Sequence, residues 1–186
     1  MSEQRPDVLS HFWAPLCAIG AHGTDAAKTP NAQICVSVFG ASIVPDRPRL
    51  LVSLSKTNYT TELVQASGTL SVTVLAQHQA HLLRPLGLES GRDGDKLAGL
   101  DTETTPAGDP YFPGAVGYAA CEVLETFDAG DATLFLVAVR DRADLGGAQP
   151  LPWAEARDVV GEEFLNAWME KTQREQAAAR ASMLWK

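Results

Sequence analysis

The chain of 186 residues lacks the marks of several protein classes. It has no basic excess, since 23 Asp and Glu against 15 Lys and Arg give a net charge of −8. Surfaces that bind nucleic acid or anionic membranes need a basic face, so we expect neither partner. No stretch approaches the roughly 20 consecutive apolar residues that span a bilayer, and the first residues show no signal peptide. We therefore expect a cytoplasmic protein.

Cysteine is scarce, and the common catalytic motifs are missing. Cys17, Cys35 and Cys121 are odd in number, far apart and without a CxxC pairing, so we expect reduced, half-buried thiols and no zinc site. Neither GxGxxG, GxxxxGK[ST] nor GxSxG occurs, which gives no support to Rossmann, Walker or serine-hydrolase sites. His78 and His81 lie three apart without a third ligand, so we expect surface histidines and no bound metal.

What the sequence does contain is a series of β-rich runs separated by turns and short helices. Six strands are predicted, at Leu16–Ala21, Ile34–Val44, Arg49–Leu54, Leu70–Leu75, Val116–Phe127 and Thr133–Arg140. Short helices are predicted at Asp7–Trp13, from Thr57 or Asn58 to Ala66, and at Gln79–Leu86. Hairpins with helices set to one side indicate an α+β, mainly β, barrel.

The segment from Trp153 onward is rich in helix formers and predicts one long C-terminal helix. Its apolar stripe thins after Thr172 and returns at 183–185, where a partner subunit is one candidate cover. We therefore divide the chain into a barrel domain, residues 1–152, and a helical extension, residues 153–186. The extension is expected to pack on the barrel or on a dimer partner.

A cluster of hydroxyl and cationic groups lies where a predicted strand enters a helix. Its members are Ser53, Ser55, Lys56, Thr57, Asn58 and Thr60. Free N–H groups and the positive helix dipole make such junctions suitable for a phosphate, although helix capping alone explains the same residues. Arg92 and Lys96 are spaced to bracket one anion, although a solvated loop with pairs to Asp93 and Asp95 is the alternative.

Several ordered motifs between Trp13 and Leu151 match one known family. They are NAQICVSVFGAS, RPRLLVSLSKTNYTTELVQASGTLSVTVL, LGLESGRDGDKLAGL and AGDATLF. This pattern resembles the flavin-reductase-like family of FMN-binding split barrels, in particular its ferric-reductase and flavoredoxin branch. The resemblance implies a six-stranded Greek-key split barrel with short helices, usually a homodimer with one FMN per subunit near the interface.

The resemblance also implies a set of cofactor-binding residues. Ile34, Cys35, Val36 and Ser37 would run along the isoalloxazine edge, and Ser53 and Ser55 would lie near the ribityl chain and pyrimidine side. Lys56 and Thr60 would meet the phosphate, with Arg92 and Lys96 closing over it. The implied chemistry is hydride transfer from NADH or NADPH to flavin N5, with FAD or riboflavin as possible substrates. Electrons would then pass to a small-molecule or protein acceptor, and the catalytic residues stay unassigned.

Two departures from the family pattern keep alternatives open. Ala132 stands where the family hairpin usually has a histidine near the nicotinamide, and Val36 replaces an asparagine that bonds the ring. Our leading hypothesis is an NAD(P)H-dependent flavin or ferric reductase. The alternatives are an electron carrier or flavin store without nicotinamide chemistry, and a split barrel retuned to haem or a deazaflavin. For haem, His11 or His22 is the nearest candidate ligand, although surface positions are expected for both.

Overall fold

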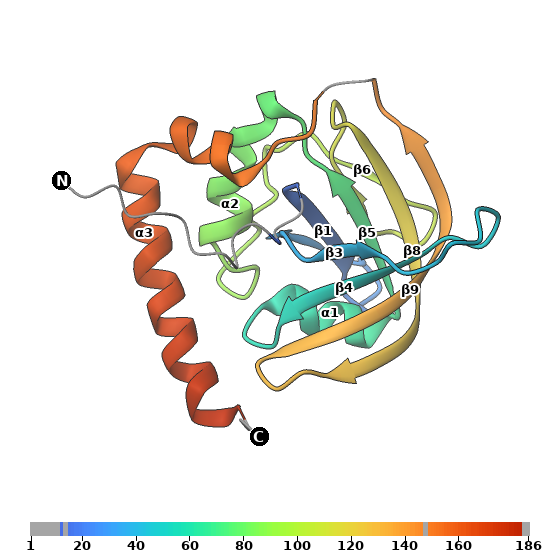
Figure 1. Ribbon diagram of the computed structural model, residues 1–186, viewed down its shortest axis with the longest axis horizontal. Helices are drawn as coiled ribbons and strands as arrows, with labels where there is room; N and C mark the ends of the chain where they lie inside the picture. Colours follow the sequence, from blue (N-terminus) through green and yellow to red (C-terminus); the bar gives the residue numbers. More distant parts are fainter. Residues whose placement is uncertain (1–11, 13–14, 147–148, 184–186) are drawn as a thin grey trace.

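The computed structural model describes Phe12, residues 15–146 and residues 149–183, and its centre is one curled antiparallel sheet (Figure 1). Seven strands form the sheet in the order β2-β1-β5-β8-β9-β4-β3. Their bounds are β1 Cys17–His22, β2 Pro30–Cys35, β3 Val38–Gly40, β4 Arg49–Ser55, β5 Thr69–Val74, β8 Gly117–Asp128 and β9 Ala132–Asp144. A separate small pair joins β6, Glu103–Thr104, to β7, Pro110–Tyr111.

The main sheet has seven strands instead of the six predicted because one predicted run is divided. The run Ile34–Val44 leaves β2 at Cys35, bends at Val36 and Ser37, and continues as β3. The two halves form opposite edges of the sheet, so the edges are consecutive in sequence and the sheet must curl. The mainly β, barrel-like class is confirmed, and the non-consecutive neighbours β1–β5 and β9–β4 are typical of Greek-key connections.

The helices begin and end close to the predicted positions. They are α1 Tyr59–Ser67, the 3₁₀ helix η2 Gln77–Leu82, α2 Leu83–Leu88 and α3 Trp153–Ser182. Helix α1 ends at Gly68, whose φ of 73° is the left-handed conformation that glycine adopts without a Cβ penalty. Helix α3 bends at Gly161, where φ is 78°. The predicted helix Asp7–Trp13 lies outside the described residues apart from Phe12.

Two buried clusters hold the elements together. One lies between the sheet and α1 and includes Val52, Val64 and Phe135. The other joins the beginning of β1 to α2 and α3 and includes Leu86 and Phe164. Because the second cluster is shared, the first half of α3 is packed against the barrel of its own chain. Within the described residues, no helix is long and apolar enough to cross a bilayer.

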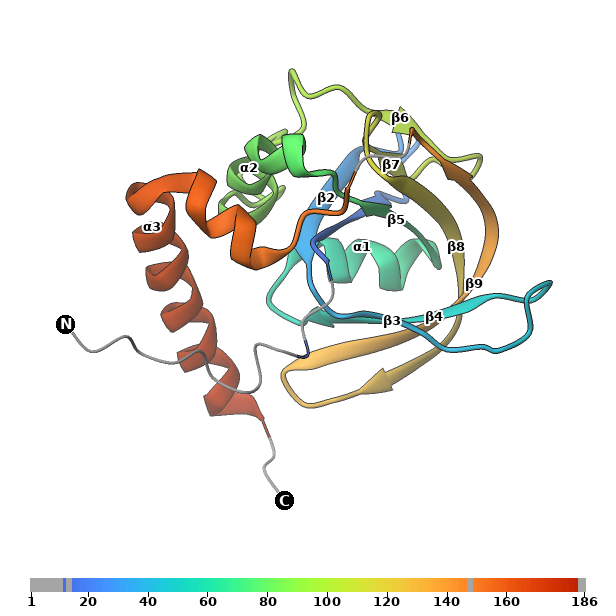
Figure 2. The same ribbon diagram turned by 45° about the horizontal axis from the view of Figure 1, so that its top comes forward.

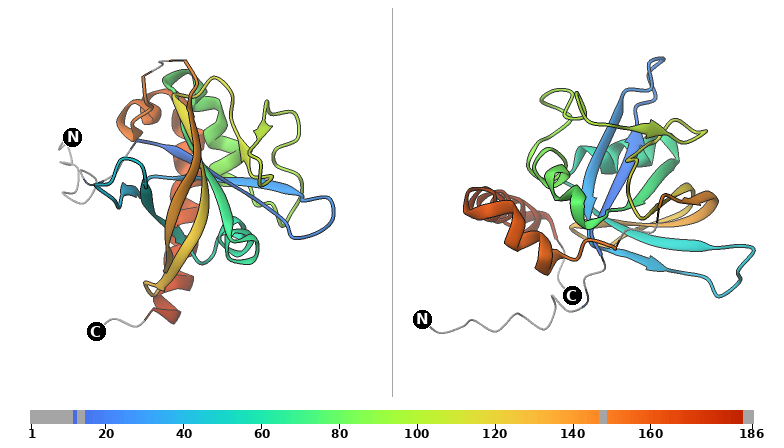
Figure 3. Two further views of the ribbon diagram at one scale, coloured as in Figure 1. Left: turned by 90° about the vertical axis from the view of Figure 1, so that its right-hand side faces the viewer. Right: turned by 90° about the horizontal axis from the view of Figure 1, so that it is seen from above.

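The second half of α3 runs beside the barrel and ends near the β8–β9 turn (Figures 2 and 3). At that end the Cγ of Met183 lies 3.0 Å from where a Cβ on Gly130 would be. The predicted apolar positions 184 and 185 lie outside the described residues. Helix α3 therefore contacts the barrel at both ends. Its middle part borders the space next to α1 and α2.

Candidate functional site

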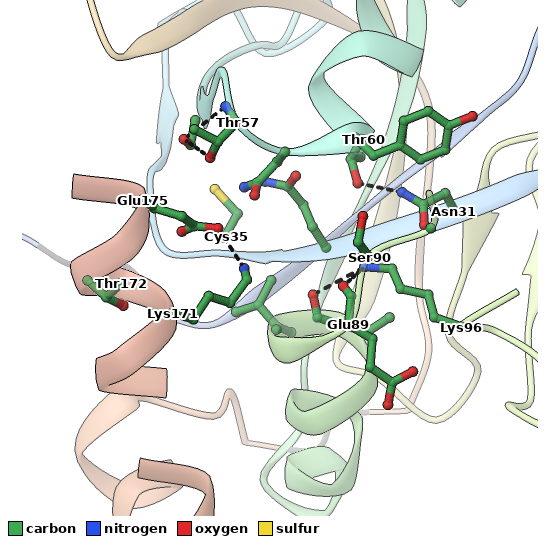
Figure 4. Close-up of a pocket in the computed structure, with 18 of the residues that line it drawn as sticks. Asn31, Cys35, Thr57, Thr60, Glu89, Ser90, Lys96, Lys171, Thr172 and Glu175 are labelled. Atoms are coloured by element: carbon green, nitrogen blue, oxygen red, sulfur yellow. Dashed lines mark hydrogen bonds and ion pairs between the residues drawn. The ribbon is translucent and has the colours of Figure 1, made fainter. Parts of the chain in front are cut away.

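A cavity of about 320 Å³ lies between the barrel and α3, within the size range of small-molecule sites (Figure 4). Its lining comes from β2, the end of β4, the start of α1, residues 86–96 and α3. Nine of the ten predicted site residues line it, namely Ile34, Cys35, Val36, Ser37, Ser53, Ser55, Thr60, Arg92 and Lys96. The fold therefore brings together predicted residues that are up to about 60 positions apart in sequence.

Lys56 is the predicted residue that does not line the cavity. Its Nζ donates to Asp128 Oδ1 at 2.6 Å, at the turn between β8 and β9. Lys56 lies in the turn just after β4, which ends at Ser55, and the ion pair with Asp128 directs its side chain away from the cavity. The geometry gives no support to a phosphate contact from Lys56.

The barrel side of the cavity carries buried oxygen atoms that have no partner in the described residues. Asn31 is 3% exposed, and its Nδ2 donates to Thr60 Oγ1 at 2.7 Å. Its Oδ1 and the Oε1 of Gln33 are buried without a hydrogen bond. Buried acceptors are almost always paired, so two orphans at a cavity wall indicate a ligand that donates to them.

The strand-to-helix turn beside these atoms is organised by its own hydroxyl groups. Ser55 Oγ lies 2.8 Å from Thr57 Oγ1, and Thr61 Oγ1 donates to the Ser55 carbonyl at 2.6 Å. Asn58 occupies the N-cap position, but its side chain makes no capping bond. Capping therefore does not account for the asparagine, which lines the cavity together with Tyr59 and Thr60 at the start of α1.

The GRDGDK loop contributes two cationic residues, Arg92 and Lys96, whose surroundings differ. Arg92 donates to the Thr57 carbonyl at 3.1 Å and pairs with Glu62, with its guanidinium 5.3 Å above the Tyr59 ring. Lys96 is only 9% exposed and donates to the carbonyls of Leu86 and Glu89. Burial and repulsion from Lys171 lower the pKa of Lys96 to about 8.

Cys35 is a thiol in the cavity wall. Its Sγ donates to the Ser53 carbonyl and accepts a hydrogen bond from the Ser37 N–H. Burial raises the pKa of Cys35 to about 11, so the thiol is neutral at pH 7 and a poor nucleophile. Cys17 and Cys121 are likewise free, and all three are fully buried where half-buried thiols are predicted.

Fourteen further residues line the cavity that are not among the ten predicted site residues, and they include Asn31, Gln33, Trp168, Lys171, Thr172 and Glu175. The first two had a signal in the sequence, because positions two apart on a strand share a face with Cys35. The last four come from the second half of α3, and their place depends on how that helix docks. No local pattern encodes this docking.

Comparison with known proteins identifies the family. A family model described as "Flavin reductase like domain" matches residues 9–159. The chain belongs to this family. Among curated relatives, the high molecular weight rubredoxin of Moorella thermoacetica is 33% identical over 126 residues, 67% of this chain and 54% of that protein. The chain thus spans about half the length of that relative.

Two further proteins are similar to this flavin reductase-like chain. Reductase subunit HsaB of a flavin-dependent monooxygenase from Mycobacterium tuberculosis is 28% identical over 145 residues, 78% of this chain and 73% of that protein. The solved FMN-binding protein from Thermus thermophilus, with bound 1-cyclohex-2-enone, has a TM-score of 0.67 at 23% identity and covers 81% of this chain and 84% of its own. This structural likeness shows a shared fold.

The three histidines that the structure of this flavin reductase-like protein describes do not line the cavity. His22 is 6% exposed, contrary to the predicted surface position, and its Nδ1 lies 3.1 Å from Asp109 Oδ1. Burial raises the pKa of Asp109. His78 and His81 are exposed as predicted, and the described residues contain no group of three or more metal-ligating side chains. His11 lies outside the described residues.

Proposed function

We propose that this chain binds FMN in the cavity and acts as an NAD(P)H-dependent flavin or ferric reductase. The observation that carries the proposal is the pair of buried, unpartnered oxygens, Asn31 Oδ1 and Gln33 Oε1, beside the open start of α1. A flavin nucleotide offers ring and ribityl donors to such oxygens and an anionic phosphate to cationic groups. Membership in the flavin reductase-like family supports the same ligand.

The residues present fit this cofactor. Ile34 and Val36 are partly buried apolar side chains beside the cavity and suit the edge of an aromatic ring. Ser53 and Ser55 offer hydroxyl groups at the end of β4, and Lys96 offers a buried cation for the phosphate. The bound flavin would supply the redox chemistry, while the protein supplies orientation and electrostatics.

The protein's own groups would control polarity and water around the ring. Cys35 keeps its proton at Sγ because burial raises its pKa, so the wall beside the ring carries no charge. The unpaired Gln33 Oε1 would accept a hydrogen bond from a ligand N–H or O–H. Trp168 lines the cavity from α3 and would shield that side of a bound ligand from water.

The test uses the purified full chain. We expect a flavin absorption band, either as isolated or after adding FMN, with bleaching when NADH or NADPH is added without oxygen. A protein that stays colourless and binds no added FMN or riboflavin would contradict the flavin-binding proposal. The two donors, tested separately, also show which nicotinamide cofactor is used.

One observation favours a second function, a flavin carrier or store without nicotinamide chemistry. Ala132 replaces the histidine expected from the family pattern, and it pairs with Ser55 across β4 and β9 without lining the cavity. In that case FMN binds, but neither nicotinamide bleaches it at a useful rate. The haem alternative has less support, because no histidine of the described residues lines the cavity. A deazaflavin would show its own spectrum in the same experiment.

The partners of the reaction are also proposals. The names of relatives mention a rubredoxin and a monooxygenase reductase subunit, which supports a small-molecule or protein electron acceptor. One related structure is named an NADH:FAD oxidoreductase, so FAD or riboflavin as a diffusing substrate stays within the proposal. Exposed Phe39, Ile43 and Phe127 support a homodimer, which light scattering of the full chain would test.

A further inference from the structure

Helix α3 presents an ion pair to the cavity. Lys171 and Glu175 are one turn apart, with Nζ and Oε1 at 3.0 Å, and their side chains are 28% and 34% exposed. Both residues line the cavity from the side opposite Lys96 (Figure 4). A pair of this kind within one helix stabilises the helix only slightly, so it can exchange for a better partner at low cost.

Lys96 faces the same space with spare hydrogen-bonding capacity. An ammonium group has three donors, and Lys96 uses two of them, on Glu89 O at 3.1 Å and on Leu86 O at 3.5 Å. It forms no ion pair with a carboxylate among the described residues. Burial is the main cause of the lowered pKa of Lys96, and repulsion from Lys171 adds to it. Two cations face this space, and the carboxylates near them, Glu89 and Glu175, are exposed or partly exposed, so together the two cations form a place for an anion.

The other cations near the cavity are already engaged. Lys56 is paired with Asp128 outside the lining, and Arg92 is paired with Glu62 and the Thr57 carbonyl. Lys96 and Lys171 also both border a second cavity of about 590 Å³ that adjoins the first. They therefore stand at the junction of the two cavities, where the end of a ligand filling the first cavity would meet both ammonium groups.

We propose that Lys171 of α3, together with Lys96, binds the 5′-phosphate of the flavin nucleotide, and that this phosphate displaces Glu175 from Lys171. The inference rests on the proposed flavin-binding function and adds a specificity residue to it. A phosphate carries about 1.5 to 2 negative charges at pH 7. The charge-assisted hydrogen bonds it accepts are stronger than the partly exposed ion pair between Lys171 and Glu175. FMN and FAD both carry this group, whereas riboflavin lacks it.

The consequence is that α3 makes the site selective for phosphorylated flavins. The helix is anchored on both sides of Lys171, by Trp168 packed against Gly87 and by Met183 packed against Gly130. Lys171 therefore reaches the phosphate from a held segment. Glu175 acts as a temporary counter-ion that keeps Lys171 directed at the cavity before the ligand arrives.

The test compares dissociation constants of FMN, FAD and riboflavin for the full chain and three variants. Lys171→Gln is expected to weaken FMN and FAD about tenfold or more, while riboflavin stays within about twofold. Glu175→Gln is expected to tighten FMN severalfold and leave riboflavin unchanged, since it removes the competing carboxylate. Arg180→Gln removes one positive charge from the exposed face of α3 and is the matched control, with no effect expected.

Comparing FMN with riboflavin distinguishes a failure of the phosphate proposal from a failure of the proposed function. If the unmodified chain binds neither FMN nor riboflavin, the proposed function itself is wrong. If it binds both and Lys171→Gln weakens them equally, Lys171 is structural and the phosphate assignment is overturned. A Glu175→Gln variant that binds FMN more weakly would overturn the displacement step. Thermal unfolding of each variant confirms that the comparison is made on folded protein.

Discussion

The two walls of the cavity are built differently. On the barrel side, Asn31 and Thr60 are 3% and 1% exposed and joined by a buried hydrogen bond of 2.7 Å. On the α3 side, Lys171 and Glu175 are about a third exposed and held by an ion pair within one helix. Loss of a buried hydrogen bond costs about 1 to 3 kcal/mol, whereas an exposed ion pair contributes less than about 1 kcal/mol. The barrel wall is therefore rigid, and the helix wall is adjustable.

This difference suggests a division of labour for the ligand. A rigid wall with preplaced acceptors suits the ring and the sugar chain, whose donors have fixed positions. An adjustable cationic wall suits a charged end group, whose binding depends more on charge than on direction. Substitutions in the two walls should therefore change flavin binding and stability differently, and they are taken in order of decreasing expected effect.

Gly91→Ala is expected to damage the barrel wall most. A Cβ on Gly91 would lie 2.4 Å from Asn31 Oδ1 and 3.0 Å from Tyr59 Cδ1, so the loop must move away from β2. We expect FMN and riboflavin binding both to weaken by more than about tenfold, with unfolding easier by about 1 to 3 kcal/mol. Flavin fluorescence titration and urea denaturation measure the two effects.

Gly94→Ala is the matched control, because the same loop offers its Cβ open space, with nothing within 4 Å. It should bind both flavins normally. A Gly91→Ala protein with unchanged affinity for both flavins would mean that Asn31 Oδ1 is not part of the ligand site.

Gly87→Ala is expected to disturb the helix wall. A Cβ there would lie 2.6 Å from Cζ3 of Trp168, which pushes the middle of α3 outward. Since the indole ring can turn aside, we expect a smaller cost, about 1 kcal/mol in unfolding free energy, and earlier proteolysis within α3. Limited proteolysis followed by mass spectrometry gives the cleavage sites. Cleavage that begins in the barrel loops instead would show that α3 does not depend on this contact.

Much of the fold followed from the sequence, because its strands and helices have local signals. The hairpin of β8 and β9, helix α1 with its Gly68 stop, and the long helix from Trp153 were all predicted near their observed bounds. The division at Val36 and Ser37 was missed, because an apolar run does not show where a curled sheet changes edge. The split of the chain at residue 152 stays a prediction.

The residues predicted for the site lie between positions 34 and 96, and nine of them line the cavity. The lining residues of α3 were missed, because only tertiary contacts bring them to the cavity. Ser53 and Ser55 were predicted from the strand-to-helix cluster and the family resemblance, and both line the cavity, whereas Lys56 pairs with Asp128, a contact that no local pattern shows. The α3 residues carry no motif, since their spacing is that of any exposed helical face. Only docking through Phe164 and Trp168 turns that face toward the cavity.

Lys96 lines the cavity between the two walls and would make the proposed phosphate binding depend on pH. Its pKa is lowered from 10.5 to about 8, so the ammonium is charged below pH 8 and increasingly neutral above it. We expect FMN affinity to fall as pH rises from 7 to 9.5, by up to about tenfold, while riboflavin affinity changes little. Lys96→Gln should flatten the FMN profile. A constant ratio of FMN to riboflavin affinity across this range would contradict the role of Lys96.

The lowered pKa of Lys96 affects stability in the opposite direction: the free energy of unfolding rises with pH, whereas FMN affinity is expected to fall. The unfolded chain, with a lysine pKa near 10.5, binds more protons than the folded chain between about pH 8 and 10.5. The contribution of Lys96 to the free energy of unfolding therefore rises with pH in that window, as the cost of a buried charge is removed. Urea denaturation at pH 7.5 and 9.5, compared with Lys96→Gln, isolates this contribution from those of other groups.

Lys56→Gln is expected to have the smallest effect, although Lys56 lies next to the cavity in sequence. Its partner Asp128 is 73% exposed and Lys56 itself 41%, so their ion pair is screened by solvent and adds little stability. The pair holds Lys56 Nζ at the β8–β9 turn and away from the cavity. FMN affinity should stay within about twofold, in contrast to Lys96→Gln, which removes the same charge from inside the lining. Titration of both variants with FMN at low salt makes the comparison most sensitive, and an equal loss in the two would place the phosphate near the β8–β9 turn instead of between Lys96 and Lys171.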